Sequence, residues 1–448
     1  MRLLRRWRLP AGRQAPRNDK NIMHKTNKLT NGLDIITAPI AGAKTVTILF
    51  MAATGSRFEN KANSGISHFL EHMFFKGTRK RPTTLAITSE LDKVGGEYNA
   101  FTGKEYTGYY VKVEAGQFKL ALDVLSDMLL NSRFKAEEIE REKAVVIEEL
   151  NMYRDNPMAY IEDLFEQCLY GDSPAGRDTL GSIASIKSFS RAGLSLYYNS
   201  QYSPDQAVIA LAGKIDAAAV KLAAGYFKNF SRKKYRGQAA TDDRQAAPAL
   251  KLHFKKTDQA HLSLGVRAVP YGQADELTVK LTALILGGTM SSRLFTHLRE
   301  RNGLAYYVRT HEETYTDSGY LATQAGVPID KLESAIKIIL RQYREISTRL
   351  VGAAELNKAK QCLIGRTALS LESSDSLASW YGRQAILNKE QAGGREILTP
   401  EEYYKKIKKI TAADIRLAAA KIFAPGKLNL AVIGPYQREE EFKKMLKI

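Results

Sequence analysis

The second half of this sequence repeats the first in outline, and this repeat constrains the fold more than any other feature. The stretch 108–125, a strand-like run followed by an amphipathic helix pattern, is echoed by 319–338. Each half also closes on a short apolar strand, 207–213 in the first and 428–434 in the second. Strands that alternate with amphipathic helices are typical of an α+β fold. The sequence therefore predicts two homologous α/β sandwich domains, each a mainly antiparallel sheet packed with helices.

The amino-acid composition indicates where the two repeated halves are joined. One stretch, 236–248, is polar and rich in Ala and Gln, with Gly237 and Pro248, which is typical of a linker. Each half has about 200 residues, enough for a hydrophobic core of its own. We expect a basic N-terminal extension at 1–22, a first domain at 23–235 and a second domain at 249–448.

A short motif in the first half carries metal-binding chemistry, because residues 68–72 read His-Phe-Leu-Glu-His. On a helix, residues four apart lie on one face, so His68 and His72 can bind one metal ion. Glu71 would lie beside that ion as a base, and these are the parts of a zinc hydrolase. The alternative, a helix with two histidines by chance, is disfavoured because the 448 residues include only 7 His. The order His-x-x-Glu-His is that of the inverzincin motif.

A catalytic zinc site normally has a third protein ligand. The stretch 134–150 predicts a long helix, with Ile139, Val146 and Leu150 on one apolar face. Glu142 and Glu149 are seven residues apart, so they also share a face. Helix patterning alone would make them part of a solvated charged face.

The motif and its surroundings resemble the pitrilysin and insulin-degrading-enzyme family of zinc peptidases, with mitochondrial processing peptidase as the related two-domain form. The matching parts are residues 68–72, Glu149 77 residues later, and the stretches 55–59 and 65–78. The resemblance implies one Zn²⁺ per chain, with Glu149 as the third ligand beside His68 and His72. It also implies that Glu142 is a supporting acid. Glu148 competes with Glu149 for the ligand role.

The resemblance extends to a segment that would bind substrate. Residues 95–113 predict two strands joined near Gly103. In the resembled family this segment includes an edge strand, which implies that Asn99 and Ala100 pair with an extended peptide by β-augmentation. The alternative is an ordinary hairpin with a polar turn. Glu71 would accept a proton from water and pass it to the leaving amine.

The second half has no His-x-x-Glu-His, and the repeat places Arg366 opposite Glu149. It instead contains Arg299 and Tyr306, seven residues apart, which resemble the second signature of the family. The resemblance implies that both reach the substrate and transition state from the facing domain, as donors to an oxyanion and a carbonyl. The alternative places Arg299 on a helix surface and Tyr306 in a strand core.

Composition limits the location of the protein. The 2 Cys, Cys168 and Cys362, form no disulfide framework, and no apolar run approaches the length of a membrane span. Residues 1–22 are Arg-rich and acid-poor like a mitochondrial transit peptide, but they contain two Pro and no Ser. An artefact of the start site, with translation from Met23, is an equal alternative. The segment around Arg299 resembles bacterial members, which favours the bacterial cytoplasm over the mitochondrial matrix.

The chain is basic, with a net charge of +19, of which residues 1–22 carry +6. The remaining cations are scattered, and the densest run, 405–409, is typical of a solvated helix face. We therefore expect no specific nucleic-acid partner.

The sequence predicts a zinc endopeptidase for short or unfolded peptides, working in a chamber closed by a second chain. Single-chain members of the resembled family are about twice as long, which implies a homodimer or a heterodimer with a paralogue. The main alternative is a non-catalytic scaffold or partner subunit with the processing-peptidase fold. The intact His68, Glu71, His72 and Glu149 count against it.

Overall fold

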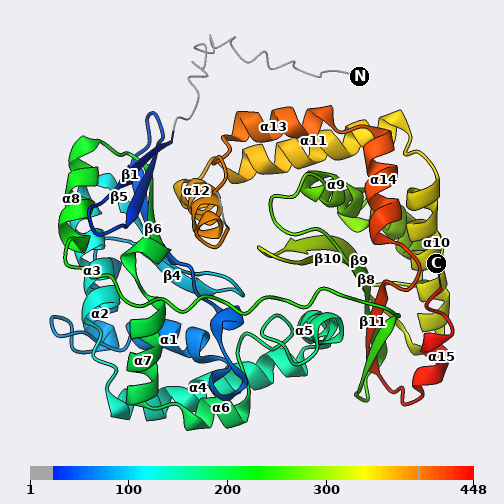
Figure 1. The fold of residues 1–448 in the computed structure, drawn as a ribbon, viewed down its shortest axis with the longest axis horizontal. Helices are drawn as coiled ribbons and strands as arrows, with labels where there is room; N and C mark the ends of the chain where they lie inside the picture. Colours follow the sequence, from blue (N-terminus) through cyan, green and yellow to red (C-terminus); the bar gives the residue numbers. More distant parts are fainter. Residues whose placement is uncertain (1–23, 392–393, 448) are drawn as a thin grey trace, which may run out of the picture.

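Two sheets, each covered by helices, face one another across the middle of the molecule in the computed structural model, which describes residues 24–391 and 394–447 (Figure 1). This confirms the α+β prediction. The predicted extension at 1–22 lies outside the described residues. No described helix is long and apolar enough to cross a membrane.

The first sheet has six strands in the order β1-β2-β6-β3-β5-β4. Four of its neighbouring pairs are antiparallel, and β2 with β6 is the parallel pair. Strand β4 is therefore an edge strand. The strands are β1 Lys25–Lys28, β2 Asp34–Pro39, β3 Thr45–Ala52, β4 Glu97–Thr102, β5 Thr107–Glu114 and β6 Ala207–Gly213.

The second sheet has five strands in the order β7-β11-β8-β10-β9. Three of its pairs are antiparallel, and β7 with β11 is the parallel pair. This order matches the first sheet from β2 to β4, strand for strand. The strands are β7 Ala249–Phe254, β8 Gln259–Arg267, β9 Tyr307–Thr314, β10 Gly319–Pro328 and β11 Leu428–Gly434.

Helices of each half cover one face of its own sheet, and the alternating side chains of the strands build that core. The first-half helices are α1 Ile66–Phe74, α2 Thr84–Asp92, α3 Phe118–Asn131, α4 Ala136–Asp155, α5 Pro157–Tyr170, α6 Ile183–Ser188, α7 Arg191–Gln201 and α8 Ala217–Phe227. The second-half helices are α9 Glu276–Gly287, α10 Leu332–Thr348, α11 Ala353–Ser370, α12 Ser374–Lys389, α13 Pro400–Lys409, α14 Ala412–Ile422 and α15 Glu439–Lys443.

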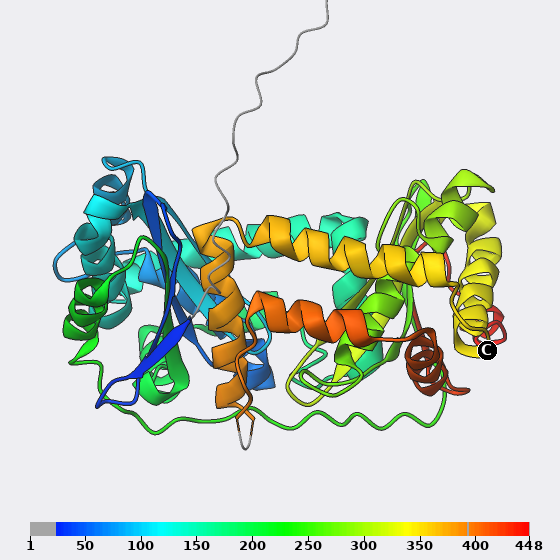
Figure 2. The ribbon, with the colours of Figure 1, turned by 90° about the horizontal axis from the view of Figure 1, so that it is seen from above.

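The opposite face of each sheet is covered by a helix from the other half of the sequence. Helix α12 packs on β3 and β6, where Leu377 and Tyr381 meet Leu49 and Val208. Helix α5 packs on β7, β8 and β11, and its Phe165 lies in one cluster with strands of that sheet. Both helices lie between the two halves (Figures 1 and 2). Two further hydrophobic clusters therefore combine residues of both halves.

The chain crosses from the first half to the second between Phe227 and Ala249, where no helix or strand forms (Figure 2). The predicted linker 236–248 lies in this crossing. The predicted domain boundaries stay predictions, because the exchanged helices tie the two halves together.

Candidate metal centre and peptide-binding edge

Helix α1 carries His68 and His72 one turn apart, with their ring centroids 4.6 Å from each other. Gly65 starts this helix at a φ of 89°. A Cβ at Gly65 would lie 2.3 Å from the carbonyl oxygen of Leu180, so glycine is needed both for the backbone conformation and for the space. The start of α1 therefore requires glycine at this position.

A buried carboxylate holds the first turn of α1. Glu59 accepts hydrogen bonds from the backbone N–H groups of Gly65, at 2.6 Å, and Ser67, at 2.8 Å. These N–H groups have no partner within the helix, and a negative charge at a helix N-terminus is favourable. Burial raises the pKa of Glu59 to about 7, against the effect of these hydrogen bonds.

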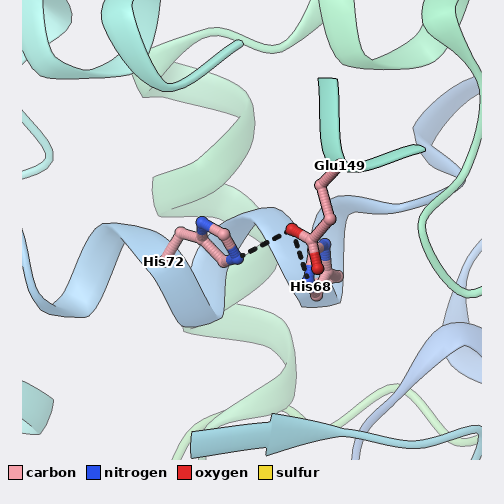
Figure 3. Close-up of side chains that lie close together, drawn as sticks. All are labelled: His68, His72 and Glu149. Atoms are coloured by element: carbon pink, nitrogen blue, oxygen red, sulfur yellow. Dashed lines mark ion pairs between the residues drawn. The ribbon is translucent and has the colours of Figure 1, made fainter. Parts of the chain in front are cut away.

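The three side chains predicted as ligands lie together. Oε2 of Glu149, from α4, is 3.7 Å from Nε2 of His68 and 3.5 Å from Nε2 of His72 (Figure 3). Tetrahedral zinc binds such ligands at about 2.0–2.2 Å, which requires about 3.3–3.6 Å between ligand atoms. Among the described residues these three form the group that could hold a metal ion. The donor set therefore fits zinc, with one of the two distances inside this range and the other 0.1 Å above it.

Helix α4 presents Glu149 to α1 and turns Glu148 outward. Ile139, Val146 and Leu150 are buried, as the predicted apolar face requires. Glu148 is exposed. The geometry thus favours Glu149 over Glu148 as the third ligand.

Glu142 is buried behind His72, and its Oε1 lies 2.8 Å from Nδ1 of that ring. This contact makes Nδ1 the donor, which leaves Nε2 free as a ligand atom. Glu142 also forms an ion pair with Lys76. Burial opposes ionisation of Glu142, but the hydrogen bonds and charges of His72 and Lys76 outweigh it and lower its pKa.

The imidazole of His68 is more deeply buried than that of His72. Burial, with the neighbouring His72, lowers the pKa of His68 to about 3. The ring is therefore neutral at physiological pH, and neutral imidazole is the form that binds metal.

Glu71 lies beside this group and contacts the edge strand. Its Oε2 accepts a hydrogen bond from Oγ1 of Thr102, the last residue of β4. Burial raises the pKa of Glu71, against the hydrogen bond from Thr102. A carboxylate with a raised pKa beside a candidate metal site is a stronger base than an ordinary carboxylate, which suits it to accept a proton from water.

We call His68, His72 and Glu149 the metal group. A depression of about 260 Å³ extends from His72 of this group to β4. The backbone of an edge strand has unpaired N–H and C=O groups along one side. Asn99 is exposed on this strand, and its Oδ1 accepts a hydrogen bond from the N–H of Ala100 at 2.8 Å. The depression is lined by Glu71, His72, Phe75, Lys76, Tyr98, Asn99 and Glu142.

Arg299 and Tyr306 lie next to each other in the second half. Arg299 lies in the π-helical turn η5, Phe295–Glu300, and donates a hydrogen bond to the backbone oxygen of Tyr306 at 2.8 Å. The Tyr306 side chain is exposed rather than in a strand core, at 74%. In the described part of one chain, no hydrogen bond or ion pair joins either residue to the metal group.

Sequence reasoning did not assign roles to Glu59 and Thr102. Glu59 falls in the stretch 55–59, which was part of the family resemblance, but its cap on α1 needed the fold. Thr102 carried no signal, because a threonine near a strand end is common.

Two family models match the chain. One, described as insulinase (peptidase family M16), matches residues 35–182, and the other, described as the peptidase M16 inactive domain, matches residues 188–363. The first spans the candidate metal group, and the second begins in the first half and ends in α11 of the second half.

Curated relatives match over nearly the whole chain. The uncharacterized zinc protease YmxG of Bacillus subtilis is 37% identical, over 82% of this chain and 88% of its own length. An uncharacterized zinc protease of Streptomyces coelicolor is 32% identical, over 92% of this chain and 90% of its own. One from Rickettsia felis is 33% identical, over 91% and 97%.

Two solved structures share the fold. A protease from Helicobacter pylori has a TM-score of 0.86 at 20% identity, covering 93% of this chain and 100% of its own. A structure described as a peptidase M16 inactive domain, from Pseudomonas fluorescens, has a TM-score of 0.81 at 19% identity, covering 92% and 98%. At these identities the likeness shows the fold alone.

Proposed function

The chain belongs to the insulinase family of peptidases, M16, and from that premise we propose that it is a zinc-dependent endopeptidase acting on short or unfolded peptides. The observation that carries the proposal is the group of His68, His72 and Glu149 with Glu71 beside it. A structural metal site would need no base next to the ligands.

The residues divide the chemistry between them. Bound zinc would supply a Lewis acid that polarises water and the peptide carbonyl. Glu71 takes the proton of the attacking water and gives it to the leaving amine. Glu142 orients His72 through Nδ1 and so keeps Nε2 directed at the metal.

Strand β4 would hold the substrate. An extended peptide can add to the edge of the first sheet next to Asn99 and Ala100, with main-chain hydrogen bonds supplying affinity. The depression beside Tyr98 and Glu71 supports this placement, because it runs from the edge strand to the metal group.

Arg299 and Tyr306 would complete the site from a second chain. Within one chain they contact each other rather than the metal group, and both are exposed and available to a partner. We propose a homodimer, or a heterodimer with a paralogue, that encloses the peptide in a chamber in the bacterial cytoplasm.

The alternative is a non-catalytic scaffold or partner subunit with the processing-peptidase fold. The second half falls, as far as residue 363, within a family model named for an inactive domain, and it lacks the motif in sequence. The first half retains His68, Glu71, His72 and Glu149, none of which a scaffold requires.

The deciding experiment combines metal analysis of the purified protein with digestion of a random peptide library. The expected result is one zinc per chain and cleavage of peptides that a chelator abolishes and added zinc restores. A chain that binds no zinc and cleaves no peptide would favour the scaffold.

A further inference from the structure

The stretch 55–59, Gly-Ser-Arg-Phe-Glu, lies against the turn that joins β4 to β5. The backbone N–H groups of Ser56 and Arg57 donate to the carbonyl oxygens of Gly103, at 3.2 Å, and Lys104, at 2.9 Å. A Cβ at Gly55 would lie 2.2 Å from the same Gly103 oxygen, so only glycine permits this approach.

Arg57 is almost fully buried, at 1% exposed, and its guanidinium connects two turns. Nη1 donates to Glu105, in the β4–β5 turn, at 2.5 Å. Nη2 donates to both carboxylate oxygens of Asp317, each at 2.7 Å, in the turn between β9 and β10. The planar guanidinium suits such paired carboxylates. A single side chain of the first half thus holds a turn from each sheet.

Further contacts close the network. Glu105 accepts hydrogen bonds from the backbone N–H of Thr316 at 3.0 Å and from its Oγ1 at 2.6 Å. Thr241, in the crossing between the halves, donates its N–H to Asp317 at 2.9 Å and accepts from Nη2 of Arg57 at 2.6 Å. Burial opposes ionisation of Asp317, but Arg57 outweighs it and lowers its pKa.

This network is close in sequence to two residues that contact the candidate site, Glu59 and Thr102. Two residues after Arg57, Glu59 holds the first turn of α1. Three residues before Glu105, Thr102 ends β4 and donates to Glu71. A shift of the β4–β5 turn would therefore move the edge strand relative to the base.

We propose that Arg57 is a positioning residue, whose bridge from Glu105 to Asp317 ties strand β4 to the second half and so sets where a bound peptide lies over the metal group. This inference rests on the proposed function. Misplacement of a reacting group by about 1 Å can cost about 100-fold in rate, so the bridge bears directly on turnover.

The test uses the full chain with Asp317→Asn, which keeps the shape of the side chain but removes its charge, and Glu105→Gln. Glu333→Gln is the control, because its ion pair with Lys337 is exposed and lies within helix α10. Three quantities are measured: amide hydrogen exchange over residues 97–107, zinc content, and kcat and KM for a peptide of about ten residues, long enough to pair along a strand.

Asp317→Asn should speed exchange over 97–107 and lower kcat/KM by about tenfold or more, with zinc content unchanged. The control should match wild type. The double variant should lose less than the product of the two single losses, because both act through Arg57. Asp317→Glu should recover part of the loss.

Wild-type exchange over 97–107 in Asp317→Asn would overturn the proposal, as would losses in the two variants that multiply. A loss of zinc together with activity would also overturn it, since it would show a general structural role. If wild type itself cleaves no peptide, the proposed function fails, and the exchange measurement still decides whether Arg57 ties the two turns.

Discussion

The two halves have the same sheet order and the same single parallel strand pair, yet they differ in chemistry. In each half a long helix, α4 or α11, follows the helix after the hairpin. Helix α4 presents Glu149 to two histidines, whereas the repeat places Arg366 on α11. An arrangement of strands and helices therefore does not determine activity, which depends on the side chains it positions.

The two halves also differ in the exposure of their candidate site residues. The first half keeps its candidate metal group partly buried. The second half exposes Arg299 and Tyr306. Under the proposed function, the first half would hold the metal and the second half would contribute hydrogen-bond donors.

The largest effect is expected from the base of the first half. Glu71→Gln keeps the shape of the side chain but cannot accept a proton, so peptidase activity should fall by roughly 100-fold or more while zinc is retained. Activity and metal content are measured on the same preparation, with Glu148→Gln as an exposed control. Near-normal turnover by Glu71→Gln would show that Glu71 is not the general base.

The next largest effect is expected on zinc affinity, and it should distinguish α4 of the first half from the equivalent α11 of the second. Glu149→Gln should lower zinc affinity by more than the roughly 10–100-fold expected for a residue behind the ligands, because it removes a ligand itself. Competition with a chromogenic chelator measures the affinity. Glu148→Gln and Arg366→Gln should both bind zinc as wild type does. If Glu148→Gln loses zinc while Glu149→Gln retains it, the ligand assignment is wrong.

A smaller effect is expected when two inactive variants are mixed, which tests whether one active site combines residues of two chains. Glu71→Gln and Arg299→Ala, each inactive alone, are mixed and allowed to exchange subunits. Half of the dimers become mixed, and each has one intact site, so about a quarter of wild-type activity should return. Mass spectrometry confirms the exchange. No recovery after confirmed exchange would mean that Arg299 does not serve a partner's metal site.

The smallest effect is expected outside the repeat. Residues 1–22 are basic and show no apolar period, so a chain that starts at Met23 should melt and cleave peptides as the full chain does. Thermal unfolding and peptide cleavage are compared side by side. A substantial loss in either would show that this segment contacts the folded part.

Much of the local structure followed from periodicity. The helix predicted over 134–150 is present as α4, with Ile139, Val146 and Leu150 buried. The predicted strand pair around Gly103 is present as β4 and β5. Such patterns depend on neighbours a few residues apart, which a sequence displays directly.

Other features depended on distant contacts. The exchange of α5 and α12 was not predicted, because an apolar helix face indicates burial but does not identify the surface that covers it. The cap of Glu59 on α1 and the hydrogen bond from Thr102 to Glu71 were also absent from the pattern.

The sequence by itself determined the two histidines of the candidate metal group, the neighbouring Glu71 and the repeat of the two halves, because helical spacing and residue type are local properties. The family resemblance implied that Glu149 is a ligand and that the strand of Asn99 lies at an edge, and the tertiary structure showed that Glu149 rather than Glu148 faces the histidines and that β4 is an edge strand. The tertiary structure alone showed that Arg57 joins turns from both halves. Arg57 and Asp317 are 260 residues apart, and a contact at that separation exists only once both sheets have formed and packed.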